Sequence, residues 1–192
     1  PDSIGIELDS ALEASYEFKG ARIVSNSIRF SQNHITLNKG QKDGVKPGMG
    51  VFNHEGVVGR VKSVSENYSV AISLLNTGMM VSSKIKSIGN FGTVSWDGKN
   101  SRQIKMLYIP RHVNVQVGDT IITSGYNAVF PEGIKIGIVS SVNPGLDNPN
   151  YLDILVDLST DFSKVSYVYL VENTQFNELD SLSRQSEMPN EF

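Results

Sequence analysis

The chain has 192 residues, 39% of them hydrophobic, and at this length it can bury roughly 70% of its unfolded surface on folding. Its 17 basic residues do not exceed its 20 acidic ones, which argues against nucleic acid as a partner. The absence of cysteine excludes disulfides and thiolate metal sites. Since the sequence begins at Pro1 rather than methionine, we expect that the natural N-terminus has been removed, and a lost signal or membrane anchor stays open.

The first predicted element is a short helix, Ile6–Phe18. Leu8, Leu12 and Tyr16 recur at four-residue spacing, and Gly20 is a typical stop signal. A helix of this length is marginal by itself in water. We therefore interpret it as the stub of a longer helical region.

From Ala21 onward the hydrophobic period changes to two, which is typical of strands with one buried face. Turn signals rich in glycine, proline, asparagine and aspartate separate these segments. The predicted strands are 21–27, 34–38, 50–53, 56–64, 69–74, 80–86, 91–95, 102–109, 119–123, 134–142, 151–157 and 165–172. Twelve strands are too many for one small barrel, so we predict an all-β fold with two six-stranded β-barrels after the short helix.

Two segments of the chain share a weak internal repeat, Gly48–Val61 and Gly118–Val139. Each has a strand led by glycine, then a turn, then a strand with a central glycine, Gly59 or Gly137. Glycine inside a strand suggests a bulge, a barrel corner or close approach by another backbone. The repeat indicates either a duplication or simply two ordinary hairpins, and the sequence leaves both open.

The histidines and the most suggestive serine give no catalytic or metal site. His34, His54 and His112 stand alone, with no second ligand at metal-binding spacing. Trypsin-like proteases place the reactive serine directly after Gly-Asp, whereas several residues separate Ser124 from Gly118-Asp119. We therefore predict no catalytic residue, no metal and no cofactor.

The remaining candidates have simpler structural interpretations. Asp119 and Glu132 could form a glycosidase pair, but a carboxylate between proline and glycine, as at Glu132, is typical of a turn. The run Gly56–Gly59 lacks the lysine and hydroxyl of a phosphate loop. Trp96, the sole tryptophan, could stack on a sugar from an exposed hairpin, but packing across strands is favoured.

Arg60 follows the strand glycine Gly59 and is a candidate partner contact, although a position on a solvated barrel face is the favoured interpretation. The other singled-out positions are glycines expected to shape turns and barrel corners. They are Gly40, Gly44, Gly48, Gly56, Gly59, Gly118, Gly125, Gly133 and Gly137.

Several of these segments together resemble the rod shape-determining protein MreC family, in consistent order from about residue 21 to 171. They are Ala21–Ser25, Ile35–Val51, Gly56–Val61, Gly118–Gly125 and Phe130–Val139. The resemblance implies two six-stranded barrels after a membrane-anchored helical region, on the periplasmic side of the inner membrane. It also implies a trypsin-like fold without the catalytic triad.

The resemblance further implies a non-catalytic scaffold of the cell-elongation machinery that organises peptidoglycan synthesis. Such a scaffold binds a class B penicillin-binding transpeptidase and self-associates as a dimer or higher oligomer, with MreD, RodZ and cytoplasmic MreB in the same assembly. The chain lacks the anchor and most of the coiled coil of a full-length member, which puts self-assembly of this fragment in doubt. Direct cell-wall glycan binding and a degenerate trypsin-like hydrolase are the alternative functions.

The path of the chain between the barrels has two interpretations. Pro47-Gly48 and Val117-Gly118 look like matching entry and exit points, which favours a nested arrangement over a sequential one. The expected units are a helical stub 1–20, an outer barrel 21–45 plus 111–173, a central barrel 46–110 and a disordered tail 174–192. The sequential alternative divides the barrels into 21–88 and 89–173.

Overall fold

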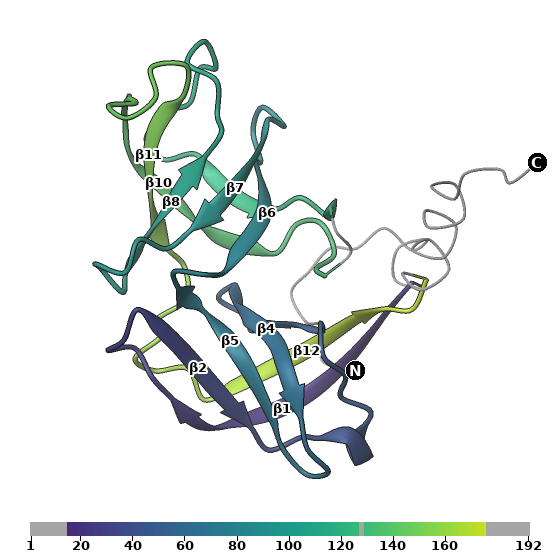
Figure 1. The fold of residues 1–192 in the computed structure, drawn as a ribbon. Helices are drawn as coiled ribbons and strands as arrows, with labels where there is room; N and C mark the ends of the chain where they lie inside the picture. Colours follow the sequence, from purple (N-terminus) through teal and green to yellow (C-terminus); the bar gives the residue numbers. More distant parts are fainter. Residues whose placement is uncertain (1–14, 127–128, 176–192) are drawn as a thin grey trace, which may run out of the picture.

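The structure, a computed structural model, describes residues 15–126 and 129–175. Within these residues the chain forms two closed antiparallel barrels of six strands each (Figure 1). The predicted all-β class and the two six-stranded barrels are confirmed. No helix of the described part is long and apolar enough to cross a membrane.

One barrel contains both ends of the described chain, and we call it the terminal barrel. Its strands are ordered β1-β12-β3-β4-β5-β2 around the closed sheet. Their bounds are β1 Tyr16–Asn26, β2 Gln32–Leu37, β3 Gly50–Phe52, β4 Val57–Val64, β5 Ser69–Asn76 and β12 Tyr167–Asn173. A single 3-10 turn, η1 (Gln41–Asp43), lies between β2 and β3.

The other barrel is built from one continuous stretch of chain, and we call it the inserted barrel. Its strands are ordered β10-β11-β8-β7-β6-β9. Their bounds are β6 Met80–Ile85, β7 Phe91–Ser95, β8 Gln103–Leu107, β9 Thr120–Thr123, β10 Lys135–Pro144 and β11 Leu152–Leu158. Each of the twelve predicted strands overlaps one observed strand.

The N-terminal boundary differs from the prediction. Tyr16 to Phe18, expected to end a helix, belong to β1, which pairs with β12 from Tyr16 opposite Asn173 onward. The four-residue apolar spacing was misleading here, because pairing with a strand from the other end of the chain overrides local helical periodicity. Most of the predicted helix and of the predicted disordered tail lies outside the described residues.

The division of strands between barrels also differs from both predicted schemes. The chain is nested, but β3, β4 and β5 close the terminal barrel, and the insertion runs from β6 to β11. The expected central barrel 46–110 and the sequential split near residue 88 are therefore wrong. Strand β5 pairs with β2 as well as with β4, so strands 50–76 are fixed to the N-terminal strands.

The two barrels share one topology when β12 is counted before β1. The neighbours then run β12-β1-β2-β5-β4-β3 in the terminal barrel and β6-β7-β8-β11-β10-β9 in the inserted one. The last strand in each order pairs with the first, β3 with β12 and β9 with β6, which closes each barrel. The terminal barrel therefore takes its equivalent of β6 from the C-terminal end of the chain.

The repeat seen in the sequence falls on equivalent strands. In the terminal barrel Gly48 N–H donates to the Val61 carbonyl over 2.8 Å, and Val61 N–H donates to Met49 over 2.8 Å. In the inserted barrel Gly118 donates to Val139 over 2.9 Å, and Val139 donates to the Asp119 carbonyl over 2.8 Å. The segments interpreted as entry and exit points are thus the same corner of two similar barrels.

Candidate functional site

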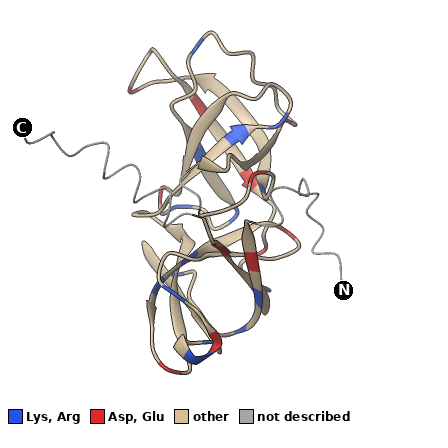
Figure 2. Ribbon diagram, turned by 90° about the vertical axis from the view of Figure 1, so that its right-hand side faces the viewer, with Lys and Arg blue, Asp and Glu red and all other residues tan. Residues whose placement is uncertain are grey.

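The barrels meet along a junction with direct contacts between them. Thr160, on the connection from β11 back to β12, is buried, and its hydroxyl donates to the Val57 carbonyl over 3.1 Å. The next backbone N–H, of Asp161, donates to a carboxylate oxygen of Glu55 over 3.0 Å. In the view of Figure 2, basic and acidic residues are interspersed over both barrels.

A small groove at this junction, which we call the junction groove, is lined mostly by apolar side chains and contains one cationic side chain. Its lining residues are Arg60, Met79, Met80, Val81, Ser82, Thr123, Gly125, Tyr126, Val129 and Phe130. Arg60 comes from the terminal barrel, and the other lining residues come from the inserted barrel or the segments leading into it. The groove is therefore a composite surface of both barrels.

Large apolar side chains stand exposed at this groove. Met80 is 60% exposed and Tyr126 is 65% exposed. Next to them Phe91, 53% exposed, packs edge-on against the Tyr126 ring, with the ring centroids 5.2 Å apart. Exposed methionine and aromatic side chains grouped together are typical of a protein-binding surface.

Arg60 lies at the edge of the junction groove on strand β4. It pairs in register with Gly50 of β3 and Ile72 of β5, and its side chain is exposed while the following Val61 is buried. Strand alternation therefore turns Arg60 outward. The structure brings this residue, singled out from the sequence, together with Met80 and Tyr126, which were not.

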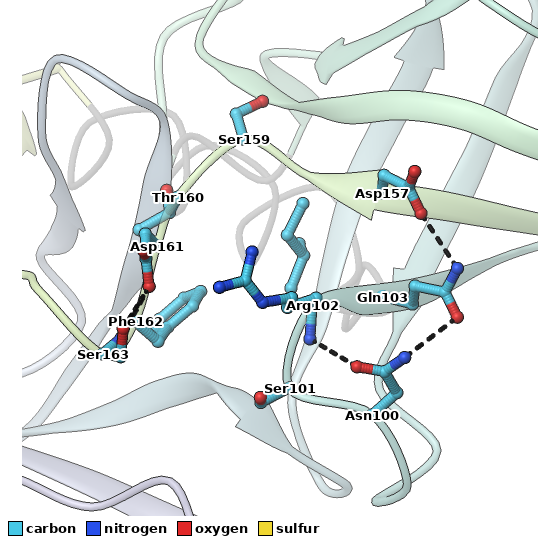
Figure 3. A pocket seen from close by; sticks show the side chains of 11 residues that line it. Asn100, Ser101, Arg102, Gln103, Asp157, Ser159, Thr160, Asp161, Phe162 and Ser163 are labelled. Atoms are coloured by element: carbon cyan, nitrogen blue, oxygen red, sulfur yellow. Dashed lines mark hydrogen bonds between the residues drawn. The ribbon is translucent and has the colours of Figure 1, made fainter.

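A second, more polar hollow of about 410 Å³ lies between the β7–β8 connection and the segment after β11 (Figure 3). On one wall Asn100 donates to Gln103 over 3.3 Å, and Gln103 donates to Asp157 over 2.9 Å. The Arg102 side chain extends into the hollow toward Asp161. These polar groups bind mainly to one another.

Asp161 has a structural role on the far wall of this hollow. Its carboxylate accepts the Ser163 hydroxyl over 2.5 Å and the Ser163 N–H over 3.0 Å. These hydrogen bonds, followed by the positive charges of Arg102 and Lys164, lower the pKa of Asp161. A carboxylate held ionised in a turn is a poor proton donor, so the geometry offers no acid–base pair.

The serine considered as a nucleophile is part of a turn. Ser124 is buried, and its hydroxyl lies 2.7 Å from that of Ser82 and accepts the Tyr126 N–H over 3.1 Å. Neither partner is a base, and no hydrogen bond joins Ser124 to a histidine in the part of the chain that the structure describes. The arrangement lacks the nucleophile and base contact of a protease.

The carboxylates considered as a glycosidase pair are engaged elsewhere. Asp119 accepts the Gln116 N–H over 2.9 Å and the Ser87 hydroxyl over 3.1 Å, which fixes the turn before β9. Glu132 forms an ion pair with Lys84 of β6. Each carboxylate thus has a local structural partner.

The histidines and the tryptophan lie apart from both surfaces. His34 is in β2, His54 in the β3–β4 loop and His112 after β8, and residues 15–126 and 129–175 contain no group of three metal-ligating side chains. Trp96 is buried, and its indole N–H donates to the Asn100 carbonyl over 2.8 Å. The packing interpretation of Trp96 is confirmed, and it is not available to stack on a sugar.

The singled-out glycines fall into two geometric groups. At Gly59 a Cβ would collide with the Ile72 carbonyl oxygen of β5, and at Gly137 with the Asp157 carbonyl oxygen of β11. Gly40 faces the backbone of the β4–β5 turn in the same way. The others have positive φ: Gly44, Gly48, Gly56, Gly118, Gly125 and Gly133. That these glycines are required for folding stays a prediction.

Sequence reasoning missed the apolar residues of the junction groove. Met80, Phe91 and Tyr126 have ordinary strand or loop contexts, and only the strand order makes them neighbours. The one signal available was the position of Tyr126 directly after Gly125, in a segment with turn residues where burial in a core is not expected. It indicates exposure without identifying a partner.

The fold and its surfaces define a two-barrel β protein whose described residues present exposed apolar grooves and no assembled catalytic site. The family model described as "Rod shape-determining protein MreC, barrel core" matches residues 23–172. The chain is 31% identical over 149 residues to the cell shape-determining protein MreC of Haemophilus influenzae, and 32% identical over 161 residues to that of Bacillus subtilis. These alignments cover 77% of this chain in both cases.

The chain belongs to the MreC family. It spans about half the length of these relatives, 41% of the Haemophilus and 55% of the Bacillus protein. Among solved structures, MreC of Listeria monocytogenes has a TM-score of 0.75 at 22% identity and covers 83% of this chain and 77% of its own. The complex between penicillin-binding protein PBP2 and MreC from Helicobacter pylori has a TM-score of 0.65 at 17% identity, covering 82% and 98%.

Proposed function

We propose that this chain is the barrel region of a non-catalytic scaffold that positions peptidoglycan synthesis in the bacterial cell-elongation machinery. In this proposal it binds a class B penicillin-binding transpeptidase. Membership of the MreC family supports the role in cell shape. The Helicobacter complex, in which MreC is joined to PBP2, supports the identity of the partner.

We assign the junction groove to the transpeptidase. The observation that carries this proposal is the group of exposed apolar side chains beside Arg60. Protein interfaces concentrate their binding energy in aromatic and arginine side chains placed near other apolar residues. Tyr126, Phe91 and Met80 supply exposed apolar area, and Arg60 supplies a cation at its edge. We therefore propose Arg60 as a partner contact at the edge of a groove that also contains Met80 and Tyr126.

The wider assembly belongs to the same proposal. We expect the barrels to lie on the periplasmic side of the inner membrane, joined through an N-terminal region to a single-pass anchor. MreD, RodZ and MreB would then share the assembly, and further copies of the scaffold would self-associate. Both barrels would act as one rigid body toward the transpeptidase, because hydrogen bonds such as Thr160 to Val57 join them.

The proposal predicts that the Tyr126 ring is an anchor for the transpeptidase. Tyr126→Ser should weaken binding of the purified transpeptidase from the same organism roughly tenfold or more. Tyr68→Ser is the matched control, because Tyr68 is 51% exposed but lies in the β4–β5 turn, away from the groove residues. Isothermal titration calorimetry gives the dissociation constants, and equal affinity for both variants would refute the assignment.

Arg60 permits a second, independent test. Arg60→Ala should weaken transpeptidase binding and reduce its salt dependence, because one exposed charge leaves the interface. Arg22→Ala, at another exposed strand position of the same barrel, should change neither property. Unchanged affinity of a folded Arg60→Ala variant would show that Arg60 only covers a solvated barrel face.

A further inference from the structure

The outer end of the inserted barrel carries a groove that the proposed function does not use. It lies where β8, β10 and β11 meet their connecting loops, at the end of the molecule away from the terminal barrel (Figure 1). The groove has a volume of about 350 Å³. We call it the tip groove. Its lining residues are Lys105, Leu107, Tyr108, Gly145, Leu146, Asp147, Asn148, Tyr151, Leu152 and Asp153.

Two tyrosines form the aromatic part of the tip groove. The rings of Tyr108 and Tyr151 meet edge to face, with centroids 6.0 Å apart and planes 82° apart. Tyr108 remains 55% exposed, and Leu146, at the hairpin between β10 and β11, is 93% exposed. The packing of one ring on the other therefore leaves aromatic surface in contact with solvent.

Tyr108 is held outward by an unusual backbone conformation. Its φ is +67°, and it is the only non-glycine residue with a positive φ in residues 15–126 and 129–175. Met106 pairs with Ile154, and Pro110 pairs with Tyr151, so one extra residue is inserted on the β8 side. This bulge lets Ile109, directly after Tyr108, return to the core with 0% exposure.

The choice of tyrosine at this bulge is not explained by the backbone. Asparagine and glycine adopt a positive φ at lower energy than a tyrosine does. If the only requirement at position 108 were to form the bulge, asparagine or glycine would be favoured over tyrosine. We interpret this as a sign that the Tyr108 ring is needed on the surface.

The rim of the tip groove determines what kind of ligand fits. Asp147 and Asn148 are exposed beside the rings, and Lys105 and Asp153 lie 3.9 Å apart as a half-exposed ion pair. An apolar peptide side chain placed here would desolvate these polar groups without giving them hydrogen bonds. A sugar ring instead can stack its C–H face on a tyrosine while its hydroxyl groups bind the carboxylates and the side-chain N–H of Asn148, whose Oδ1 already accepts the Asn150 N–H over 3.0 Å.

We infer that the tip groove is a binding site for a neutral hexopyranose chain, with Tyr108 as the stacking platform and Asp147, Asn148 and Asp153 as hydrogen-bond partners. Two carboxylates against one lysine disfavour a strongly anionic sugar. This site is separate from the junction groove and does not rest on transpeptidase binding. It replaces Trp96, whose burial removes it from sugar contact.

The test is an NMR titration of the full 192-residue chain with a glucose tetramer and with an N-acetylglucosamine tetramer. We expect saturable shifts of residues 105–111 and 145–153 with at least one of them. Tyr108→Asn should weaken binding roughly tenfold and leave the urea midpoint of unfolding unchanged or raised, because asparagine tolerates the positive φ. Tyr108→Phe, which keeps the ring, should bind within about twofold of the unaltered chain.

Three results would overturn the inference. The first is the absence of saturable binding of both tetramers to the unaltered chain. The second is unchanged affinity in a folded Tyr108→Asn variant, with the exposed Tyr68→Asn as the matched control from the other barrel. The third is equal or tighter binding of a hexuronate tetramer, which would contradict the neutral ligand class.

Discussion

The two barrels have the same strand order but reach it with different chain continuity. The inserted barrel is one uninterrupted segment from β6 to β11, whereas the terminal barrel closes only when β12 returns to pair with β1 and β3. Its closing pairs join residues far apart in sequence, such as Tyr16 and Asn173. Closing a long loop costs conformational entropy before the contacts form, so the two barrels should differ in independence and in folding order.

Removal of β12 should have the largest effect and should fall on one barrel only. A chain ending at residue 163 leaves β1 and β3 with unpaired edges, so the terminal barrel should lose its native structure. The inserted barrel keeps all its strand pairs and should retain its dispersed amide spectrum. Two-dimensional NMR measures both, and loss of structure in both barrels would show that the inserted barrel is not an independent unit.

Gly59 and Gly137 should show that the barrels are equivalent at one position. A Cβ at either glycine meets a carbonyl oxygen of the next strand, so Gly59→Ala and Gly137→Ala should each lower the free energy of unfolding by about 2–3 kcal/mol. Urea denaturation measures this loss. Gly78→Ala is the control, since a Cβ there meets only the Asn76 side chain at 3.3 Å. If one of the two strand variants behaved like the control, the barrels would not be equivalent here.

The smallest expected effect is a pH dependence from carboxylates on the terminal barrel side. The Gly40 N–H bonds to Asp43 and lowers its pKa, as the Ser163 hydrogen bonds do for Asp161. A pKa below the unfolded value stabilises the fold above that value, and the stabilisation is lost as pH falls through the folded pKa.

Asp43→Asn and Asp161→Asn should therefore each reduce the loss of unfolding free energy below about pH 4. The pH dependence of the unfolding free energy near neutral pH should change little. Urea midpoints measured from pH 7 down to pH 3 provide the comparison. A variant whose acid slope matched that of the unaltered chain would exclude its carboxylate as a source of the pH dependence. Both side chains are partly exposed, 25% for Asp43 and 29% for Asp161, so solvent screens these charges and the effect should be small beside that of the glycines.

The sequence predicted the strands well and their assignment to barrels poorly, for a physical reason. Alternation and turn chemistry are local, and they placed each of the twelve strands. Strand order depends on pairings such as Leu37 with Ser69, which no local pattern encodes. The same limit explains β1, where residues from Tyr16 onward form a strand because β12 lies beside them.

The functional surfaces were predicted only in part. Arg60 was identified from its place beside Gly59, but Met80 and Tyr126 join it only through the fold. Trp96 was weighed correctly as a packing residue, because a tryptophan before a hairpin turn commonly packs across strands. Tyr108 could not be singled out, since its positive φ arises from a one-residue shift between β8 and β11.

Amide hydrogen exchange of this chain, with and without the class B transpeptidase of the same organism, tests most directly whether the junction groove binds the transpeptidase. Binding should protect β4 around Arg60 together with residues 79–82 and 123–126, because one groove is built from both barrels. The tip groove and the β4–β5 turn should exchange as in the free chain. Protection confined to one barrel, or centred away from the junction, would contradict the claim that the junction groove binds the transpeptidase.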